Sequence, residues 1–430
     1  MRWCRMMPVA VLLILLGTCG ERPHHRVSSS QSGDTTFIQN PPSLLNDTAF
    51  LQAVLRIGSA ERGEEYLFGR ITGLSIASDG SLLVLDTQYD NLRRYSADGS
   101  FIAVVAGPGR GPGEIESGRG VTVLSDGRIV VRDAPGTTLQ LYTNDGQFDT
   151  EWRLVRARPA STQQALVPLP NDRIAVGLGI AYSSTSLIEA WPRPLFTVLG
   201  TRDGDIVDSL QGSAQHLADC ELAERRFDMG IQGDVRSRYI PQVHWALHPS
   251  GSMIIGCTAR FSFDILLPQG TVIRISLTDV EGPPVTRAEW RTFRHLIDAQ
   301  LTGTGREIDW TGVERPQLKP AYSTLLGAQD DRIWVFATRP GVETTIDPQP
   351  PPGYPNTYWR EPNGGLVFVF TLHGDYAGPL KLPPSIAFDP YDALTVPPVI
   401  RGDTVWAVTV DSLGTQSVTR FHVRPSLGHL

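Results

Sequence analysis

The sequence predicts an all-β fold, a six-bladed β-propeller of four-stranded antiparallel blades. Three observations support this prediction: a strand pattern that recurs six times, turn residues spread along the whole chain, and a spare strand before the first copy. The 430 residues include 42 Gly and 33 Pro, which suits many short strands joined by tight turns. Because 41% of the residues are hydrophobic, the chain can bury a large core, and this excludes a disordered or fibrous protein.

The recurring unit is a turn followed by a short strand rich in β-branched or aromatic residues. One further strand precedes each turn and another follows each copy. The first three copies begin about 46 residues apart, which is the length of one four-stranded blade, whereas later copies begin about 70 to 80 residues apart and must carry insertions. The six copies cover residues 80–85, 127–132, 172–177, 251–256, 331–336 and 403–408.

Each predicted sheet has two apolar faces, and it cannot bury both of them alone. Radial stacking of the sheets buries both faces and leaves only short edges exposed. The last copy lies close to the end of the chain, so the final blade lacks one strand. Residues Phe50–Ile57 form a spare strand, and we expect it to pair with the stretch 405–423 and close the ring. The alternative is a β-sandwich with a second domain, which explains copies at blade length less well.

Residues 56–150 resemble NHL-repeat propellers closely, and the rest of the folded region resembles them loosely. Later copies keep the strand and the turn but lose the aspartate that follows the strand. The resemblance implies a six-bladed propeller of a kind common among exported bacterial proteins, in which Asp86 and Asp133 fix turns through hydrogen bonds. The residues that carry it are Arg56–Gly58, Val84–Asp86, Leu92–Tyr95 and Asp98–Gly99, then Val131–Asp133, Leu139–Tyr142 and Asp145–Gly146.

The N-terminus has the features of a signal peptide. Arg2 and Arg5 precede an apolar run over Pro8–Leu16, which is too short to span a bilayer as a helix. The stretch Leu16–Gly20 resembles a bacterial lipobox, although Thr18 departs from the usual small residue. The resemblance implies lipidation of Cys19 and an exported lipoprotein that faces the outer membrane or the periplasm. A secreted protein with an ordinary signal peptide is the alternative.

These features divide the chain into three parts. We expect a lipoprotein-type signal peptide over residues 1–19, a polar and flexible tether over residues 20–48, and one propeller domain over residues 49–430. The lipid anchor is the expected contact with a membrane, and the folded domain is expected to be a monomer. The formal net charge is −7 and no basic block is present, so nucleic acid is excluded as a partner.

Two insertions within the domain have distinct patterns. A capping box at Thr286–Glu289 and apolar residues at helical spacing predict a helix near 285–302. We expect this helix to pack against the propeller rim, with a substrate lid as the alternative. The proline-rich stretch 340–365 predicts a long surface loop. Its aromatic residues either fasten the loop down or grip a ligand.

Cys220 and Cys257 are the two cysteines of the folded part. In an oxidising compartment they could form a disulfide. Two unpaired core residues are the alternative, because the sequence does not show whether the two cysteines lie close together.

The channel end of a propeller is the usual place for a ligand, because the inner strands converge there. Three of the residues expected to lead into inner strands are cationic, which suits an anionic ligand or an acidic peptide. The alternative is a rim of solvated side chains without a ligand. His244 and His248 lie about 13 Å apart on a strand and cannot share one metal ion. The candidate binding residues are Arg70, Arg119, Gln242, His244, Lys319 and Tyr322.

The sequence contains none of the strong catalytic motifs, such as HExxH, GxSxG or a P-loop. We therefore expect a non-enzymatic propeller, tethered at the bacterial cell envelope, that binds a protein, a peptide or a glycan without a metal or another cofactor. The resemblance also implies an alternative, since six-bladed relatives include lactone hydrolases and amidating lyases. Such an enzyme would hold Ca or Zn in the central channel through three or four converging Asp, Glu, Asn or His side chains.

Overall fold

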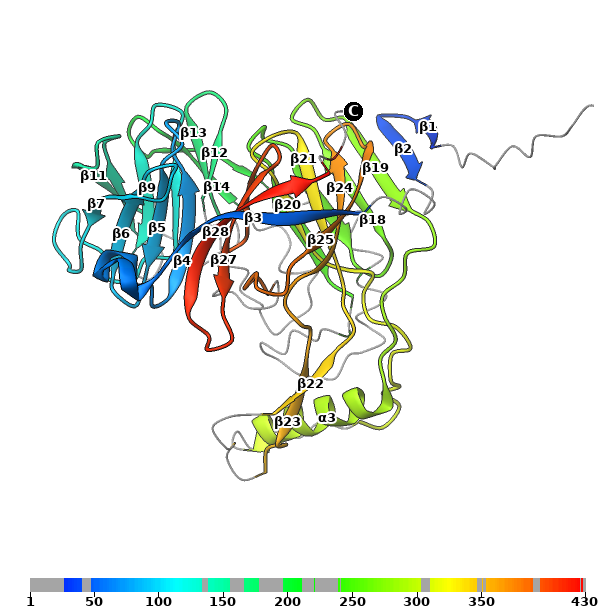
Figure 1. Ribbon diagram of the computed structural model, residues 1–430. Helices are drawn as coiled ribbons and strands as arrows, with labels where there is room; N and C mark the ends of the chain where they lie inside the picture. The colour runs from blue at the N-terminus through cyan, green and yellow to red at the C-terminus, as the bar shows by residue number, and fades with distance from the viewer. Residues whose placement is uncertain are drawn as a thin grey trace, which may run out of the picture.

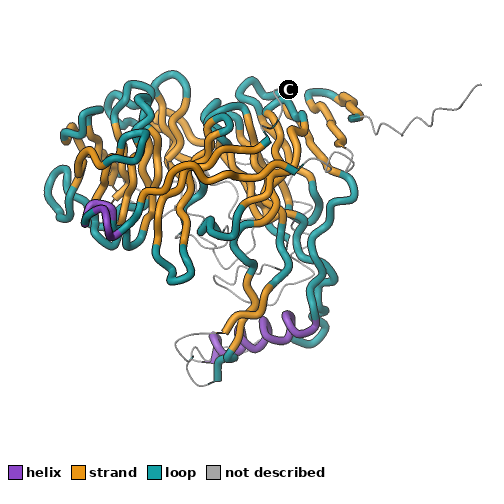
Figure 2. The backbone as a smooth tube through the Cα atoms, viewed as in Figure 1, coloured by secondary structure: helices purple, strands orange, loops and turns teal. Residues whose placement is uncertain are grey.

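The structure is a computed structural model, and it describes residues 27–40, 48–133, 138–154, 166–177, 196–210, 220, 239, 241–302, 310–345, 350, 353–389, 395–425 and 427. These ranges consist mainly of short strands, with one long helix, α3 (Arg287–Thr302), and two short 3-10 turns (Figures 1 and 2). The 3-10 turns are η2 (Ala60–Arg62) and η3 (Glu64–Tyr66). The predicted signal peptide and Cys19 lie outside the described residues.

Three four-stranded antiparallel sheets follow one another along the chain, and each keeps its strands in chain order. The first contains β4 (Ile71–Ile76), β5 (Leu82–Asp86), β6 (Asn91–Tyr95) and β7 (Phe101–Ala106). The second contains β8 (Gly120–Val123), β9 (Ile129–Asp133), β10 (Thr138–Tyr142) and β11 (Phe148–Arg153). The third contains β12 (Leu166–Leu169), β13 (Arg173–Gly177), β14 (Phe196–Gly200) and β15 (Ile206–Leu210).

The fourth sheet has the same four-stranded plan with a hairpin added at its outer edge. Its strands are β16 (Val243–Leu247), β17 (Met253–Cys257), β18 (Ser262–Leu266) and β19 (Val272–Leu277). The hairpin consists of β1 (Ser28–Ser32) and β2 (Thr35–Asn40), and β2 pairs in parallel with β19.

This hairpin corrects the part of the expected flexible tether that the structure describes, because Ser28–Ser32 and Thr35–Asn40 form strands. The rest of the tether, residues 20–26 and 41–47, lies outside the described residues. The edge of β19 supplies hydrogen bonds that a polar segment can use without a core of its own. Two side chains of β2 add anchoring contacts. Ile38 packs against the core beside Gly374, and the Phe37 ring lies 5.6 Å from the guanidinium of Arg274.

The largest sheet has eight strands and consists of two four-stranded halves. One half contains β20 (Tyr322–Gly327), β21 (Arg332–Ala337), β24 (Gly365–Thr371) and β25 (Tyr376–Leu382). The other contains β26 (Val399–Arg401), β27 (Thr404–Val410), β28 (Gln416–Arg424) and β3 (Ala49–Ile57). Only two residue pairs join the halves, where β25 and β3 run in parallel.

The spare N-terminal strand lies where the sequence predicted a pairing. β3 runs antiparallel to β28, from Ile57 opposite Val418 to Phe50 opposite Arg424, and the two strands lie side by side in Figure 1 although they come from opposite ends of the chain. The six sequence copies all coincide with second strands, namely β5, β9, β13, β17, β21 and β27. The repeat therefore marks one position in each four-stranded unit.

The second strands are buried on both faces, and this explains their continuous apolar runs. Leu83 and Leu85 of β5 pack in a cluster with Val131 of the next sheet. On the other face, Leu82 and Val84 pack in a cluster with Trp406 of β27. A strand covered by a sheet on each side does not alternate between apolar and polar residues. The described sheets and the mutual burial of their faces are consistent with a β-propeller.

The helix forms over the predicted residues, but it does not pack against the rim as expected. α3 contacts β23 (Thr357–Arg360), which pairs with β22 (Val342–Thr345). In Figures 1 and 2 these three elements project away from the main body of strands. We call α3, β22 and β23 the arm. The position of α3 follows from its apolar side, since Trp290 and Phe293 pack in a cluster with Tyr239 and Trp310 rather than with a blade.

The expected long loop over 340–365 is also corrected, because it contains the hairpin of β22 and β23. All five prolines of its central run lie between the two strands, at positions 348 to 355. The strands themselves contain β-branched and aromatic residues, which favour pairing. The prolines therefore indicate only the connection between β22 and β23, and not a loop over the whole stretch 340–365.

We expect the variant Ile57→Ala to lose about 2 to 4 kcal/mol of unfolding free energy, because Ile57 is fully buried where β3 meets β28. Urea denaturation of the purified chain measures this loss. Val54→Ala on the same strand is the control; Val54 is 42% exposed, and its loss should stay below about 1 kcal/mol. Equal losses in the two variants would contradict the packing role of β3.

Candidate functional site

The predicted binding residues lie at the starts of inner strands from four sheets. Arg70 precedes β4 and is exposed, and Arg119 precedes β8 and is half-buried. The starts of these two strands are neighbours, since Thr72 Oγ1 donates a hydrogen bond of 3.0 Å to the carbonyl of Gly118. The structure thus places the two arginines on adjacent sheets with side chains that reach solvent.

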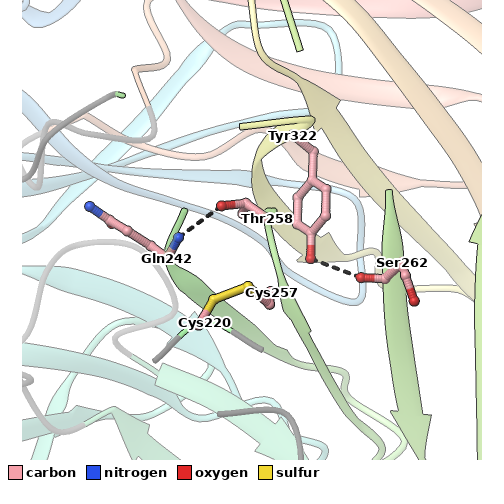
Figure 3. Close-up of a disulfide and its surroundings, with 6 residues drawn as sticks. All are labelled: Cys220, Gln242, Cys257, Thr258, Ser262 and Tyr322. Carbon is pink, nitrogen blue, oxygen red and sulfur yellow. Dashed lines mark hydrogen bonds between the residues drawn. A yellow bond between two sulfur atoms is a disulfide. The ribbon is translucent and has the colours of Figure 1, made fainter. Parts of the chain in front are cut away.

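Gln242 belongs to a hydrogen-bonded junction between the fourth and fifth units (Figure 3), and His244 lies two residues further along, on β16. The N–H of Gln242 donates to Thr258 Oγ1 at 2.9 Å, and the N–H of Thr258 donates back to the carbonyl of Gln242 at 3.0 Å. The N–H of Ala321 donates to the carbonyl of Thr258 at 2.9 Å. These bonds fix the start of β16, the end of β17 and the start of β20. Gln242 and His244 are both half-buried.

A disulfide joins Cys220 to Cys257 beside this junction (Figure 3), with 5.6 Å between the two Cα atoms. Of the two alternatives that the sequence left open, the structure has the covalent one. The bond fastens a residue of the insertion between the third and fourth sheets to the end of β17. The residues on either side of Cys220 lie outside the described ranges.

Tyr322 is not the rim residue that the sequence predicted. Its side chain is fully buried, and its hydroxyl donates to the carbonyl of Ser262 at 3.1 Å. A Cβ atom on Gly256 would lie only 2.3 Å from that hydroxyl, so the glycine provides the space. Burial raises the pKa of the Tyr322 phenol above its usual value. Tyr322 therefore joins two sheets and is closed to a ligand.

Lys319 also differs from the prediction of a cationic rim residue. Its side chain is 1% exposed, and Nζ lies 2.7 Å from Glu289 Oε1 of the arm helix. The approach departs from hydrogen-bond geometry, so charge attraction holds the pair. Nζ also donates to the carbonyl of Arg339 at 3.2 Å and lies 5.6 Å from the ring of Tyr239. These contacts offset the cost of removing the ammonium from water.

A second buried ion pair lies close by at the base of the arm. Arg339 Nε is 3.3 Å from Glu361 Oε2, and the Arg339 N–H donates to the same oxygen at 3.2 Å. The Glu361 side chain is fully buried. Gly341 allows the close approach of the first pair, because a Cβ atom there would lie 2.4 Å from Glu289 Oε1. We call Glu289, Lys319, Arg339 and Glu361 the base charges.

The base charges show what the sequence signals missed. Glu289 was identified as part of a capping box, and the box is present. The N–H of Glu289 donates to Thr286 Oγ1 at 3.1 Å, and Glu289 Oε2 accepts from the N–H of Thr286 at 3.5 Å. The same carboxylate also neutralises Lys319, which is thirty residues away. No local sequence pattern predicts a pair at that separation. The same holds for the pair of Arg339 and Glu361.

The two recurrent aspartates are buried acceptors, as the resemblance implied. Asp86 accepts from the N–H groups of Gly69, Arg70 and Gln88 at 2.7, 3.0 and 2.9 Å. Asp133 accepts from the N–H groups of Glu116 and Ser117. Each carboxylate thus fixes the chain that enters the first strand of its own sheet. The prediction of a turn-fixing role is confirmed.

Arg132 is a buried cation that the sequence reasoning overlooked. It is fully buried on β9 and donates to the carbonyl of Gly177 at the end of β13. Burial lowers its pKa to about 10. The available signal was its place in the second repeat, just before Asp133, where the other copies carry an apolar residue or glycine.

His248 serves as a link between the fourth and fifth units rather than as a ligand for a metal. Nδ1 accepts from the N–H of Ser250 at 3.0 Å, and Nε2 donates to the carbonyl of Asp330. Burial lowers the pKa of the imidazole below its usual 6.5. In the described ranges, no three His, Cys, Asp or Glu side chains gather closely enough to hold a metal ion.

The same ranges contain no helix that is both long and apolar enough to cross a membrane.

We expect Lys319→Met to cost about 3 to 5 kcal/mol of unfolding free energy, because it leaves the Glu289 carboxylate buried without its counterion. The double variant Lys319→Met/Glu289→Gln should recover most of that loss. Glutamine keeps the capping box while it removes the charge. Urea denaturation measures both, and a double variant as unstable as the single one would contradict a coupled pair.

The neutral imidazole of His248 should make stability depend on pH. Below about pH 6.5 the unfolded chain binds a proton at this histidine and the folded chain resists it, so stability present above that pH is lost as the pH falls. Between pH 7.5 and 5.5 the wild type should lose about 1 kcal/mol more than His248→Gln. Urea midpoints at the two pH values test this, and parallel losses would refute it.

The comparisons with known proteins address the fold. No protein-family model matches the chain, and no curated protein matches it in sequence. A member of the DUF4221 family from Bacteroides vulgatus is 11% identical, with a TM-score of 0.51 over 88% of this chain and 99% of that one. An exported-protein structure from Bacteroides fragilis is 12% identical (TM-score 0.44; 91% and 99% covered), as is virginiamycin B lyase from Staphylococcus aureus (0.41; 86% and 98%). At these identities the likeness to the DUF4221 protein supports a common fold alone.

Proposed function

We propose that this chain is a non-enzymatic binding module of the bacterial cell envelope, built as a six-bladed propeller that β3 closes. Counting each half of the eight-stranded sheet as a blade gives six four-stranded units. The pairing of β3 with β28 supports closure, and so does the packing of Trp406 of the last unit against Val84 of the first. A closed ring supplies a rigid frame, on which loops and insertions can bind.

The observation that carries the binding role is the arm with its base charges. Burying ions costs free energy, and the pairs of Lys319 with Glu289 and of Arg339 with Glu361 are both nearly removed from water. Apolar residues could fill the same volume at lower cost. Unlike apolar contacts, ion pairs require particular groups to meet at short distances. Here they hold the projecting helix α3 in a defined position. A projecting element held rigidly suits recognition of a partner.

The mouth of the inner strands is the second proposed binding surface. Arg70, Arg119, Gln242 and His244 are exposed or half-buried there, whereas Lys319 and Tyr322 are buried and are no longer proposed as contacts. Within the described part of the chain neither Arg70 nor Arg119 has an ion-pair partner, and two such cations suit an anionic ligand, such as an acidic peptide or an anionic glycan. Export and lipidation at Cys19 remain proposals that rest on the sequence, as do the monomeric state and the outer-membrane or periplasmic side.

Binding to an array of anionic glycans and acidic peptides tests this role. We expect the wild type to retain a subset of ligands, and Arg70→Gln/Arg119→Gln to weaken their binding by about tenfold through the loss of two charges. Arg153→Gln/Arg202→Gln is the control, since both side chains are exposed and lie on the outer strand β11 and in the turn between β14 and β15. Equal binding by both variants would contradict a ligand at the mouth.

Metal analysis separates the binding module from the alternative, a metal-dependent hydrolase or lyase of the lactonase or amidating-lyase type. The purified chain is dialysed against Ca²⁺ or Zn²⁺ and then against metal-free buffer. A binding module should retain well below one ion per chain. One retained ion per chain would overturn the non-enzymatic proposal.

A further inference from the structure

The outward side of the arm helix is basic in a chain of net charge −7. Arg287 and Arg291 are exposed on α3, and Arg294 is half-buried. At about 100° per residue these three lie within about 60° of one another around the helix. We call these three arginines the basic face. Asp298 lies within the same arc, one turn beyond Arg294, and its Oδ1 accepts from Trp310 Nε1 at 2.7 Å.

The apolar side of α3 fixes the orientation of the basic face. Trp290 and Phe293 stack with ring centroids 5.2 Å apart, and Tyr239 and Trp310 pack against them edge-on. Arg294 itself lies 4.6 Å over the ring of Trp310. Together with the pair of Glu289 and Lys319, this cluster prevents α3 from turning its arginines inward.

The basic face is placed against the rules for helix stability. Arg287 is the first residue of α3, where the helix dipole favours a negative side chain. Arg287 and Arg291 are four residues apart, so like charges face each other. Among the described residues, none of the three arginines has an acidic partner within ion-pair distance. Arg294 has a compensating contact with the ring of Trp310, whereas Arg287 and Arg291 oppose local stability, and such residues indicate a function.

We propose that the basic face of α3 binds an extended acidic peptide segment of a partner protein. Arginines four residues apart rise by about 6 Å along the helix, and alternate side chains of an extended strand are spaced by about 6.7 Å. Alternate carboxylates can therefore meet successive guanidinium groups, which bind carboxylates through paired hydrogen bonds. The segment lies along the outward side of the arm.

A membrane surface fits the basic face less well. Helices that lie in a bilayer interface present large apolar side chains beside their cations. The strongly exposed apolar residues of the described chain include none on α3, because Trp290, Phe293 and Ile297 are turned into the arm. The binding is thus electrostatic, and we expect it to weaken with salt. This inference rests on the proposed binding role and names a partner for the arm.

A fluorescein-labelled peptide of four Glu-Ser repeats tests the proposal by fluorescence anisotropy with the full chain. We expect binding at low salt that is lost near 0.5 M NaCl, and a loss of at least about tenfold in Arg287→Gln/Arg291→Gln/Arg294→Gln. Glutamine keeps the helix propensity, so the melting temperature should fall by no more than about 4 °C, the effect of losing the contact of Arg294 with Trp310. The control Arg153→Gln/Arg260→Gln/Arg401→Gln removes the same charge from exposed strand and turn positions and should bind within about twofold of wild type.

Three results would overturn the proposal: no binding by the wild type at low salt, an equal loss in the control variant, or binding to anionic phospholipid vesicles without binding to the peptide. The Arg70→Gln/Arg119→Gln variant separates this failure from a failure of the wider role. If the array ligands still depend on those two arginines, the chain binds at the mouth and only the assignment to the arm is wrong.

Discussion

The whole structure depends on the mutual burial of neighbouring sheets. Every residue of β5 is buried, because a sheet covers each of its faces. A four-stranded sheet of this kind exposes two apolar faces when it stands alone, and it is therefore stable only where neighbouring sheets cover both of them. The free energy of the fold is shared around the set of sheets. This is why a strand from residues 49–57 matters to a sheet made from the last thirty residues of the chain.

The buried charged side chains of the sheets fix the positions of neighbouring chain segments. Asp86 and Asp133 fix the chain that enters two inner strands, and Arg132 reaches across to the next sheet. Each of these buried charges has bonding partners that offset its desolvation. The base charges are likewise buried and paired, at the place where the arm leaves the sheets. The buried ionisable groups thus hold the surfaces in place, and in the proposed function the exposed arginines contact the ligand.

The hairpin of β1 and β2 covers the outer edge of the fourth sheet. β19 would otherwise present unpaired N–H and C=O groups along the outer side of the fourth sheet. β2 satisfies them through parallel pairing, and the five residues of β1 are exposed and polar. A serine-rich outermost strand offers little apolar surface to another chain. The segment between the predicted anchor and the domain thereby protects the edge to which it is attached.

The sequence by itself determined the strands, because each unit repeats a local pattern of turn, apolar run and turn. It also determined the capping box of α3 and the turn-fixing aspartates, since these depend on residues only a few positions apart or on a repeated motif. The tertiary structure alone decided which groups meet across long separations. Lys319 and Tyr322 occupy sequence positions typical of rim residues, but both are buried. Glu289 supplies the counterion for Lys319, and Gly256 leaves space for the Tyr322 hydroxyl. Charge pairing, a disulfide and the space left by a missing Cβ depend on distances between segments remote in sequence, and no periodicity along the chain records those distances.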